Sequence, residues 1–224
     1  MSAPALPVLS LLETRVLGVL CEKQHTVPDT YPLSLNALMA GCNQKTSRHP
    51  LIEVSEAEVQ SAIDSLKGPA LVMESSGGRV TRYAHNMGRA LQLPAQSIAL
   101  LTVLMLRGPQ TVGELRINCE RLHRFADISA EGFLQELAER PAGAMVVELP
   151  RQPGARETRW AHLLGGVPII EEFAAAASAF GAPAAGVTAS DIAALKANVA
   201  RLEAEVDALK NTVGRLCAEL GVAV

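Results

Sequence analysis

Two heptapeptides decide the fold: RVTRYAH at Arg79–His85 and RETRWAH at Arg156–His162. Five of the seven positions are identical, a sixth is aromatic in both, and the two segments lie 77 residues apart. The same offset places Ser34–Cys42 (SLNALMAGC) on Thr111–Cys119 (TVGELRINC), with the hydroxyl, apolar, Leu and Cys positions matched. Because two separate segments agree on one offset, the sequence predicts two copies of one structural unit.

Each copy predicts three helices at equivalent places. Apolar residues at helical spacing mark the first and third helices. A hydroxyl N-cap marks the start of the second and third, and Ser55 with Glu58 and Thr111 with Glu114 form capping boxes. The expected helices begin with Leu11–Glu22, at Ser34 and at Ser55 in the first copy, and with Ala95–Leu106, at Thr111 and at Ser129 in the second.

A hairpin follows the three helices in both copies. In the first, Leu71–Met73 is expected to pair with Arg79–Tyr83; in the second, Met145–Leu149 with Arg156–Trp160. Glycine and proline between the strands supply the turn geometry. Three helices and then a hairpin is the winged-helix order. The sequence thus predicts a mainly α protein with small β-hairpins, built of winged-helix domains at residues 10–90 and 93–165.

The tail predicts a coiled coil. A short helix and an Ala/Gly/Pro linker occupy residues 166–189, and residues 190–221 carry an unbroken heptad repeat. Its a positions are mostly β-branched and its d positions are Leu, which favours a parallel two-stranded coiled coil and hence a homodimer. The alternatives are antiparallel pairing and packing of the stripe on the body. The expected dimerisation residues are Ile192, Leu195, Val199, Leu202, Val206, Leu209, Val213 and Leu216.

Composition limits the function classes. The chain has 224 residues, 49% of them hydrophobic, and a formal net charge of −3. Residues 1–165 hold 16 basic and 16 acidic residues, so the deficit belongs to the tail. No apolar run reaches the ~20 residues of a membrane span, and the N-terminus does not read as a signal peptide. The four cysteines lie far apart, which is typical of a reduced, cytoplasmic protein without a disulfide or zinc framework.

Several longer motifs carry a family resemblance. The segment PDTYPLSLNAL at Pro28–Leu38 is followed by CNQK and Arg48, and LRGPQT occurs at Leu106–Thr111. With GELR at Gly113–Arg116, FAD at Phe125–Asp127 and RWAH at Arg159–His162, the chain resembles the YceH-like family of uncharacterised bacterial proteins over roughly residues 10–165. This resemblance implies a tandem winged-helix fold and supplies no activity.

No motif predicts catalysis. The chain lacks a G-x-S-x-G elbow, a Walker-type loop, H-E-x-x-H and G-x-G-x-x-G. The five histidines are isolated, and His85 and His162 occupy equivalent strand ends, where a hydrogen bond closing the hairpin is the expected role. We therefore expect no enzyme, no cofactor and no metal.

The charge pattern bears on nucleic-acid binding. In a helix-turn-helix, the third helix enters the major groove, but both third helices here are net acidic, which disfavours that mode. The basic residues lie mainly in loops and hairpins instead. The candidate nucleic-acid or partner surface is Asn43, Gln44, Lys45, Ser47, Arg48, Arg79, Arg82, Arg116, Arg156 and Arg159. Structural roles compete: Lys45 and Arg48 would cap the second helix, and Arg82 and Arg159 would pair with acids of the third helix.

Two functions are consistent with this pattern. The first is a non-enzymatic dimeric winged-helix protein that binds DNA and regulates transcription. The alternative is a protein-interaction module, a winged-helix adaptor of a larger complex without direct DNA binding. Acidic third helices favour interaction, whereas the polar, acid-free segment Asn43–His49 favours DNA.

Overall fold

Ser10 starts the first helix, α1 (Leu11–Thr26), by accepting a hydrogen bond from the Glu13 amide while the Glu13 carboxylate bonds back to the Ser10 amide. In this computed structural model, residues 8–76, 80–126, 129–152 and 154–166 are described. All belong to one unit of the chain, Met1–Ile169. The predicted linker helix and heptad segment, beyond residue 166, lie outside the described residues.

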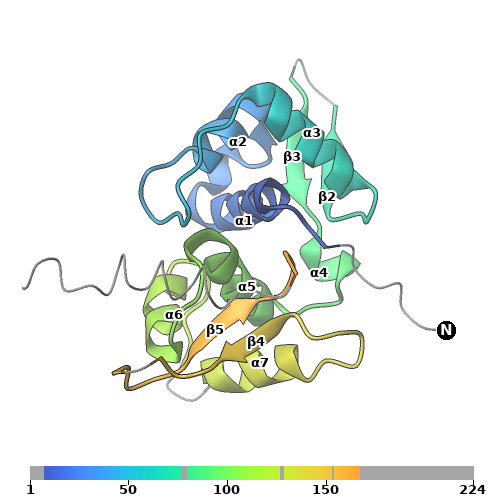
Figure 1. Ribbon diagram of the computed structural model, residues 1–224. Coiled ribbons are helices and arrows are strands. Elements are labelled where there is room, and N and C mark those ends of the chain that lie inside the picture. The colour runs from blue at the N-terminus through green and yellow to red at the C-terminus, as the bar shows by residue number, and fades with distance from the viewer. Residues whose placement is uncertain (1–7, 77–79, 127–128, 153, 167–224) are drawn as a thin grey trace, which may run out of the picture. The chain divides into compact units, whose positions relative to one another are not determined.

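The first repeat contains three helices and a small sheet (Figure 1). After α1, a 3₁₀ turn (Pro28–Thr30) leads to strand β1 (Leu33–Ser34) and helix α2 (Leu35–Cys42). Helix α3 (Glu56–Lys67) starts at the predicted Ser55–Glu58 capping box. Strands β2 (Val72–Ser75) and β3 (Arg82–His85) complete an antiparallel sheet in the order β1-β3-β2, with Leu33 opposite Tyr83 and Val72 opposite His85.

The second repeat follows a short helix, α4 (Met87–Ala90). Helices α5 (Ala95–Arg107), α6 (Val112–Cys119) and α7 (Ser129–Ala138) precede strands β4 (Val146–Leu149) and β5 (Arg159–His162), and Thr111 caps α6 as predicted. Gln110 bridges to Trp160, 77 residues on from Leu33 and Tyr83. The fold is therefore mainly helical with small antiparallel sheets. The repeat seen in the sequence corresponds to equivalent residue contacts in the two copies.

The predicted strand boundaries were wrong by a few residues. β3 begins at Arg82 and β5 at Arg159, later than the starts of the two heptapeptides, and both strands run on to a histidine. Pairing is set by the inward-facing side chains, Tyr83 opposite Glu74 and Trp160 opposite Glu148. In the second hairpin, residues 156–158 belong to the loop instead of the strand.

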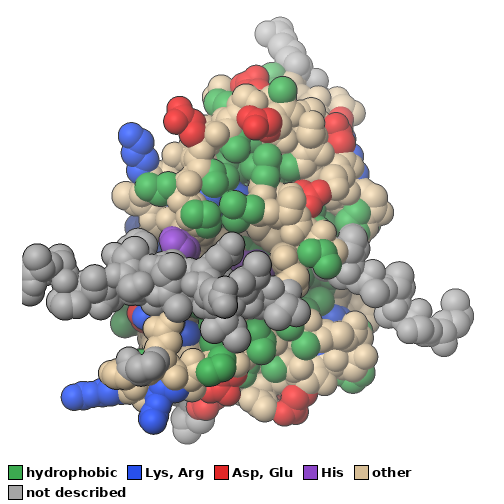
Figure 2. All heavy atoms as spheres, viewed as in Figure 1, with side chains coloured by type: hydrophobic (Ala, Val, Ile, Leu, Met, Phe, Trp, Pro, Cys, Tyr) green, Lys and Arg blue, Asp and Glu red, His purple; other side chains and the backbone are tan. Residues whose placement is uncertain are grey.

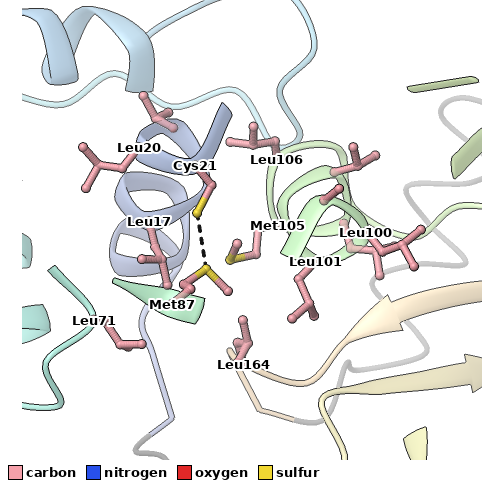
Figure 3. Packing of buried hydrophobic residues seen from close by; sticks show 14 of the residues in the cluster. Leu17, Leu20, Cys21, Leu71, Met87, Leu100, Leu101, Met105, Leu106 and Leu164 are labelled. Atoms are coloured by element: carbon pink, nitrogen blue, oxygen red, sulfur yellow. Dashed lines mark hydrogen bonds between the residues drawn. The ribbon is translucent and has the colours of Figure 1, made fainter. Parts of the chain in front are cut away.

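One core joins the two repeats, because the first helix of each packs on the other. Figure 3 shows Leu17, Leu20 and Cys21 of α1 in one cluster with Leu101, Met105 and Leu106 of α5, all of them buried. Gly18 permits the close approach: a Cβ there would lie 2.9 Å from Leu106 Cδ2. Figure 1 shows α1 and α5 between the two hairpins. The repeats therefore share a core instead of being joined only by a linker.

The three cysteines that the structure describes are free thiols buried in this core. Cys42 and Cys119 end the equivalent helices α2 and α6, and Cys21 donates a hydrogen bond to Met87 Sδ at 3.3 Å. All three are buried, and burial raises the pKa of each thiol to about 12. Since the thiolate is the reactive form, none is a nucleophile at neutral pH.

Candidate nucleic-acid interface

The loop between α2 and α3, residues 43–54, holds half of the predicted surface residues. Asn43 does not face solvent with free donors: its Nδ2 donates to Val54 O at 2.8 Å, and its Oδ1 accepts from the Val54 amide at 2.9 Å. This pair of bonds closes the loop at its base. Asn43 thus has a structural role in the loop, and its place in a nucleic-acid or partner surface stays a prediction.

Arg48 is buried, with no exposed side-chain surface. Its guanidinium donates to both carboxylate oxygens of Glu22, at 2.6 and 3.1 Å, and its Nε donates to Gly41 O at 3.1 Å. The prediction that Arg48 contacts DNA was therefore wrong. The competing structural role is confirmed for Arg48, since Gly41 O lies in the last turn of α2, where the helix dipole favours a cation.

The other loop residues differ in exposure. Gln44 Oε1 accepts from Arg48 at 3.2 Å and from Lys23 at 3.4 Å, so Gln44 belongs to the same network. Ser47 accepts a hydrogen bond from Arg107 of α5 at 2.8 Å. Within residues 43–49, only Lys45 and Thr46 are exposed. The loop consequently presents one cation, Lys45, where the sequence suggested a basic cluster.

Arg15, a second buried arginine, was missed by the sequence reasoning. It lies in α1 with no exposed surface and donates to Cys42 O at 3.3 Å and Pro50 O at 2.6 Å. Burial and the neighbouring Arg48 lower the pKa of Arg15. The available signal was a charged residue within the apolar run of the first helix, since a buried charge needs partners.

The hairpin arginines Arg82 and Arg159 brace equivalent strands. Arg82 Nη1 donates to Pro32 O at 2.8 Å, and Arg159 Nη1 donates to Pro109 O at 2.9 Å, again 77 residues on. Arg159 also pairs with Glu114 of α6 at 3.2 Å. The structural role of both arginines is confirmed, but their partners differ from those expected. They bind carbonyl oxygens that precede the second helix of each repeat, and Arg159 also binds an acid on that helix, whereas acids of the third helix were expected. Arg79 lies outside the described residues.

Four exposed arginines remain in the second repeat: Arg121 and Arg124 after α6, and Arg151 and Arg156 in the β4–β5 loop. We call these the exposed arginines. Arg124 makes only a surface pair with Glu120 at 3.5 Å, an interaction worth little. Figure 2 shows Lys and Arg side chains projecting at the lower left, where Figure 1 places the β4–β5 loop. Arg116, also predicted, is half-buried on α6.

Acidic side chains line both third helices, as predicted. Glu56, Glu58 and Asp64 are exposed on α3, and Glu131 and Glu136 on α7, with Glu139 exposed directly after it. Figure 2 shows Asp and Glu side chains gathered over the upper part of the molecule, where α3 lies. Arg48 is buried and paired with the half-buried Glu22, so it is the burial of Arg15 that leaves the surface of the first repeat with more acid than its residue count suggests. This surface would repel phosphate.

Of the two histidines at the strand ends, His85 has the expected hydrogen bonds, whereas the Nδ1 of His162 is buried without a hydrogen-bond partner among the described residues. His85 Nδ1 accepts from the Met87 amide at 3.4 Å, and its Nε2 lies within hydrogen-bond distance of Gln24 Oε1, so the neutral ring is satisfied on both sides. Burial lowers the pKa of His85 and of His162 to about 4. Within the described ranges, no group of three or more His, Cys, Asp or Glu could hold a metal ion. No helix in this part of the chain is long and apolar enough to cross a bilayer.

These features define a mainly helical protein of two equivalent repeats, with a bridging loop and an arginine-bearing hairpin. The chain belongs to the family described as "Protein of unknown function, DUF480", whose model matches residues 9–155. It is 64% identical over 209 residues to a UPF0502 protein of Dechloromonas aromatica. The aligned residues make up 93% of this chain and 95% of that protein.

Two further relatives support the same membership. A UPF0502 protein of Methylibium petroleiphilum is 61% identical over 219 residues, covering 97% of this chain and 92% of its own. Another, of Burkholderia orbicola, is 58% identical over 221 residues, covering 98% and 92%. The resemblance drawn from the motifs is thus confirmed as membership in a family of uncharacterised bacterial proteins, whose names state no activity.

Proposed function

We propose that this chain is a non-enzymatic, dimeric winged-helix protein of the cytoplasm that binds the backbone of duplex DNA through its second repeat. The order of elements supports the winged-helix part. In each repeat, three helices precede a hairpin, and a short extended segment before the second helix pairs with the last strand: β1 with β3, and Gln110 with Trp160. In the proposal, residues 190–221 pair two such chains.

The exposed arginines carry the DNA part of the proposal. Arginine guanidinium groups bind phosphate well, and those in the β4–β5 loop project from the body on a hairpin. The acidic face of α7 opposes entry of that helix into the major groove, so the contacts are to phosphates and carry no base readout. A regulatory role would then depend on the spacing of the two subunits.

A salt titration tests this proposal. Binding to a random 24-base-pair duplex should weaken with salt, and log K should fall by about 0.9 per decade for each phosphate contact. The double variant Arg151→Ala with Arg156→Ala should bind more weakly and with a shallower slope. Arg89→Ala, which removes an exposed arginine from α4, is the matched control and should leave both unchanged. Absence of binding at ~50 mM salt would overturn the proposal.

Exposed apolar side chains favour a second candidate, the protein-interaction module. Met73 and Val80, at the first hairpin, are 52% and 56% exposed, and Ile117 on α6 is 75% exposed. An isoleucine this exposed does nothing for phosphate binding, whereas protein interfaces bury such side chains. A stoichiometric protein partner that is lost with Ile117→Ser and kept with Arg151→Ala would favour this candidate over DNA binding.

A further inference from the structure

The α2–α3 loop of the first repeat reaches across to the second repeat. The His49 amide donates to Leu106 O at 2.7 Å, and Arg107 donates to Ser47 Oγ at 2.8 Å, both at the end of α5. The His49 ring lies against Gly108, where a Cβ would come within 3.1 Å of its Cδ2. Gly108 also has φ of +77°, a conformation that favours glycine. The loop therefore packs against the end of α5 and is hydrogen-bonded to it.

Buried charges fix the other side of this loop to its own repeat. Arg48 is held by both carboxylate oxygens of Glu22 on α1, and Arg15 of the same helix donates to Pro50 O. Ser47, directly before Arg48 in the chain, has φ of +58°. These hydrogen bonds hold the loop to α1, and those of Ser47 and His49 hold it to the end of α5, so the loop connects the two helices.

Hydrogen bonds continue from the end of α5 to the second hairpin. Pro109 O accepts from Arg159, and Gln110 exchanges two backbone hydrogen bonds with Trp160, at 3.0 and 2.8 Å. Gln110 is itself 93% buried, and its side chain accepts from Asn118 Nδ2 at 2.8 Å. Arg159 and Trp160 open β5, directly after the loop that carries Arg151 and Arg156.

From this continuous path we infer that the α2–α3 loop of the first repeat positions the β4–β5 hairpin of the second. Arg48 and Ser47 would then be positioning residues for DNA binding, acting through the end of α5 without touching DNA. The part of this inference that concerns DNA rests on the proposed function. The hydrogen-bonded connection between the α2–α3 loop and the β4–β5 hairpin, which we call the link, does not. The first repeat, whose surface is acidic, thereby has a role in the same activity as the second.

Two readouts separate positioning from contact. Glu22→Gln and Ser47→Ala each weaken one anchor with a small change of shape. In the absence of DNA, both should speed hydrogen exchange of the Gln110 and Trp160 amides about tenfold, while amides of β3 exchange as in the unchanged chain. Both should also weaken duplex binding threefold to tenfold without changing the salt slope, because no phosphate contact is lost.

Lys45→Ala is the matched control, since Lys45 lies in the same loop and is exposed; it should change neither readout. Unchanged exchange at Gln110 and Trp160 in both folded variants would overturn the link. A salt slope that falls for Lys45→Ala, as it should for Arg151→Ala, would show that the loop itself contacts DNA and would also overturn it. If the unchanged chain binds no duplex, the proposed function fails, and the exchange result still decides the link.

Discussion

At the scale of single residues, two glycines on helices have opposite surroundings. A Cβ at Gly18 of α1 would meet Leu106 Cδ2 at 2.9 Å in the core, whereas a Cβ at Gly132 of α7 would meet nothing within 4 Å. Gly18→Ala should therefore lower the free energy of unfolding by about 1–3 kcal/mol through overpacking. Gly132→Ala should raise it by up to about 1 kcal/mol through helix propensity.

Urea denaturation of the two variants checks this, with the unchanged chain as reference. A Gly18→Ala protein as stable as the reference would mean that α1 and α5 do not approach as closely as the structure shows. The comparison is a fair one because both substitutions are chemically identical and both sites are helical.

Residue identity alone could not assign the arginines. Arg48 and Lys45 are both basic residues of one polar loop, yet Arg48 is buried and Lys45 is exposed. The difference comes from Glu22, which lies 26 residues earlier and becomes a neighbour only through the packing of α1 on α2. Arg82 and Arg159 show the opposite case, because their place in the repeated heptapeptide already suggested a repeated structural role.

At the scale of elements, the ends of β3 and β5 make stability depend on pH. The folded pKa values of His85 and His162 are about 4, below the ordinary value of 6.5. The unfolded chain therefore binds more protons between these values, and stability falls as the pH is lowered from about 6.5 to 4. Above pH 6.5 both states are neutral, and the full contribution is present.

Thermal unfolding between pH 4 and pH 7.5 measures this dependence. His85→Gln and His162→Gln should each flatten it, by on the order of 3 kcal/mol at most between the two ends. His123→Gln is a control outside the strand ends. An unchanged pH dependence in the double variant would show that the rings are protonated as readily in the folded protein as in the unfolded one.

Helix starts were easier to predict than strand starts. Ser34, Ser55 and Thr111 cap their helices as expected, because a cap is local: a hydroxyl meets an amide three residues on. The strands begin later than the heptapeptides because their pairing depends on which side chains reach the core. That choice depends on α1 and α3, which are distant in sequence.

At the scale of the whole molecule, subunit pairing is the largest expectation that falls beyond residue 166. Leu202→Glu with Leu209→Glu should place two carboxylates in the predicted seam and give a particle with the mass of one chain by light scattering. Lys196→Glu alone, outside the a and d positions, is the milder comparison. A double variant with the mass of the unchanged protein would contradict a dimer held by this segment.

The buried arginines also change how the charge of the body is understood. An equal count of acid and base predicted a neutral body, but two cations of the first repeat, Arg15 and Arg48, are inside it. Among the described residues, exposed acidic side chains outnumber exposed Lys and Arg in both repeats, six to three in the first and six to four in the second.

The placement of the cysteines has a consequence for oxidative chemistry. Cys42 ends α2 in the first repeat, Cys119 ends α6 in the second, and Cys21 lies where α1 faces Met87 in the shared core. Each region thus has its own shielded sulfur atom. An oxidant or alkylating reagent can modify one of them only after the surrounding helices separate, so the pattern of modified sites would record which part of the molecule had opened.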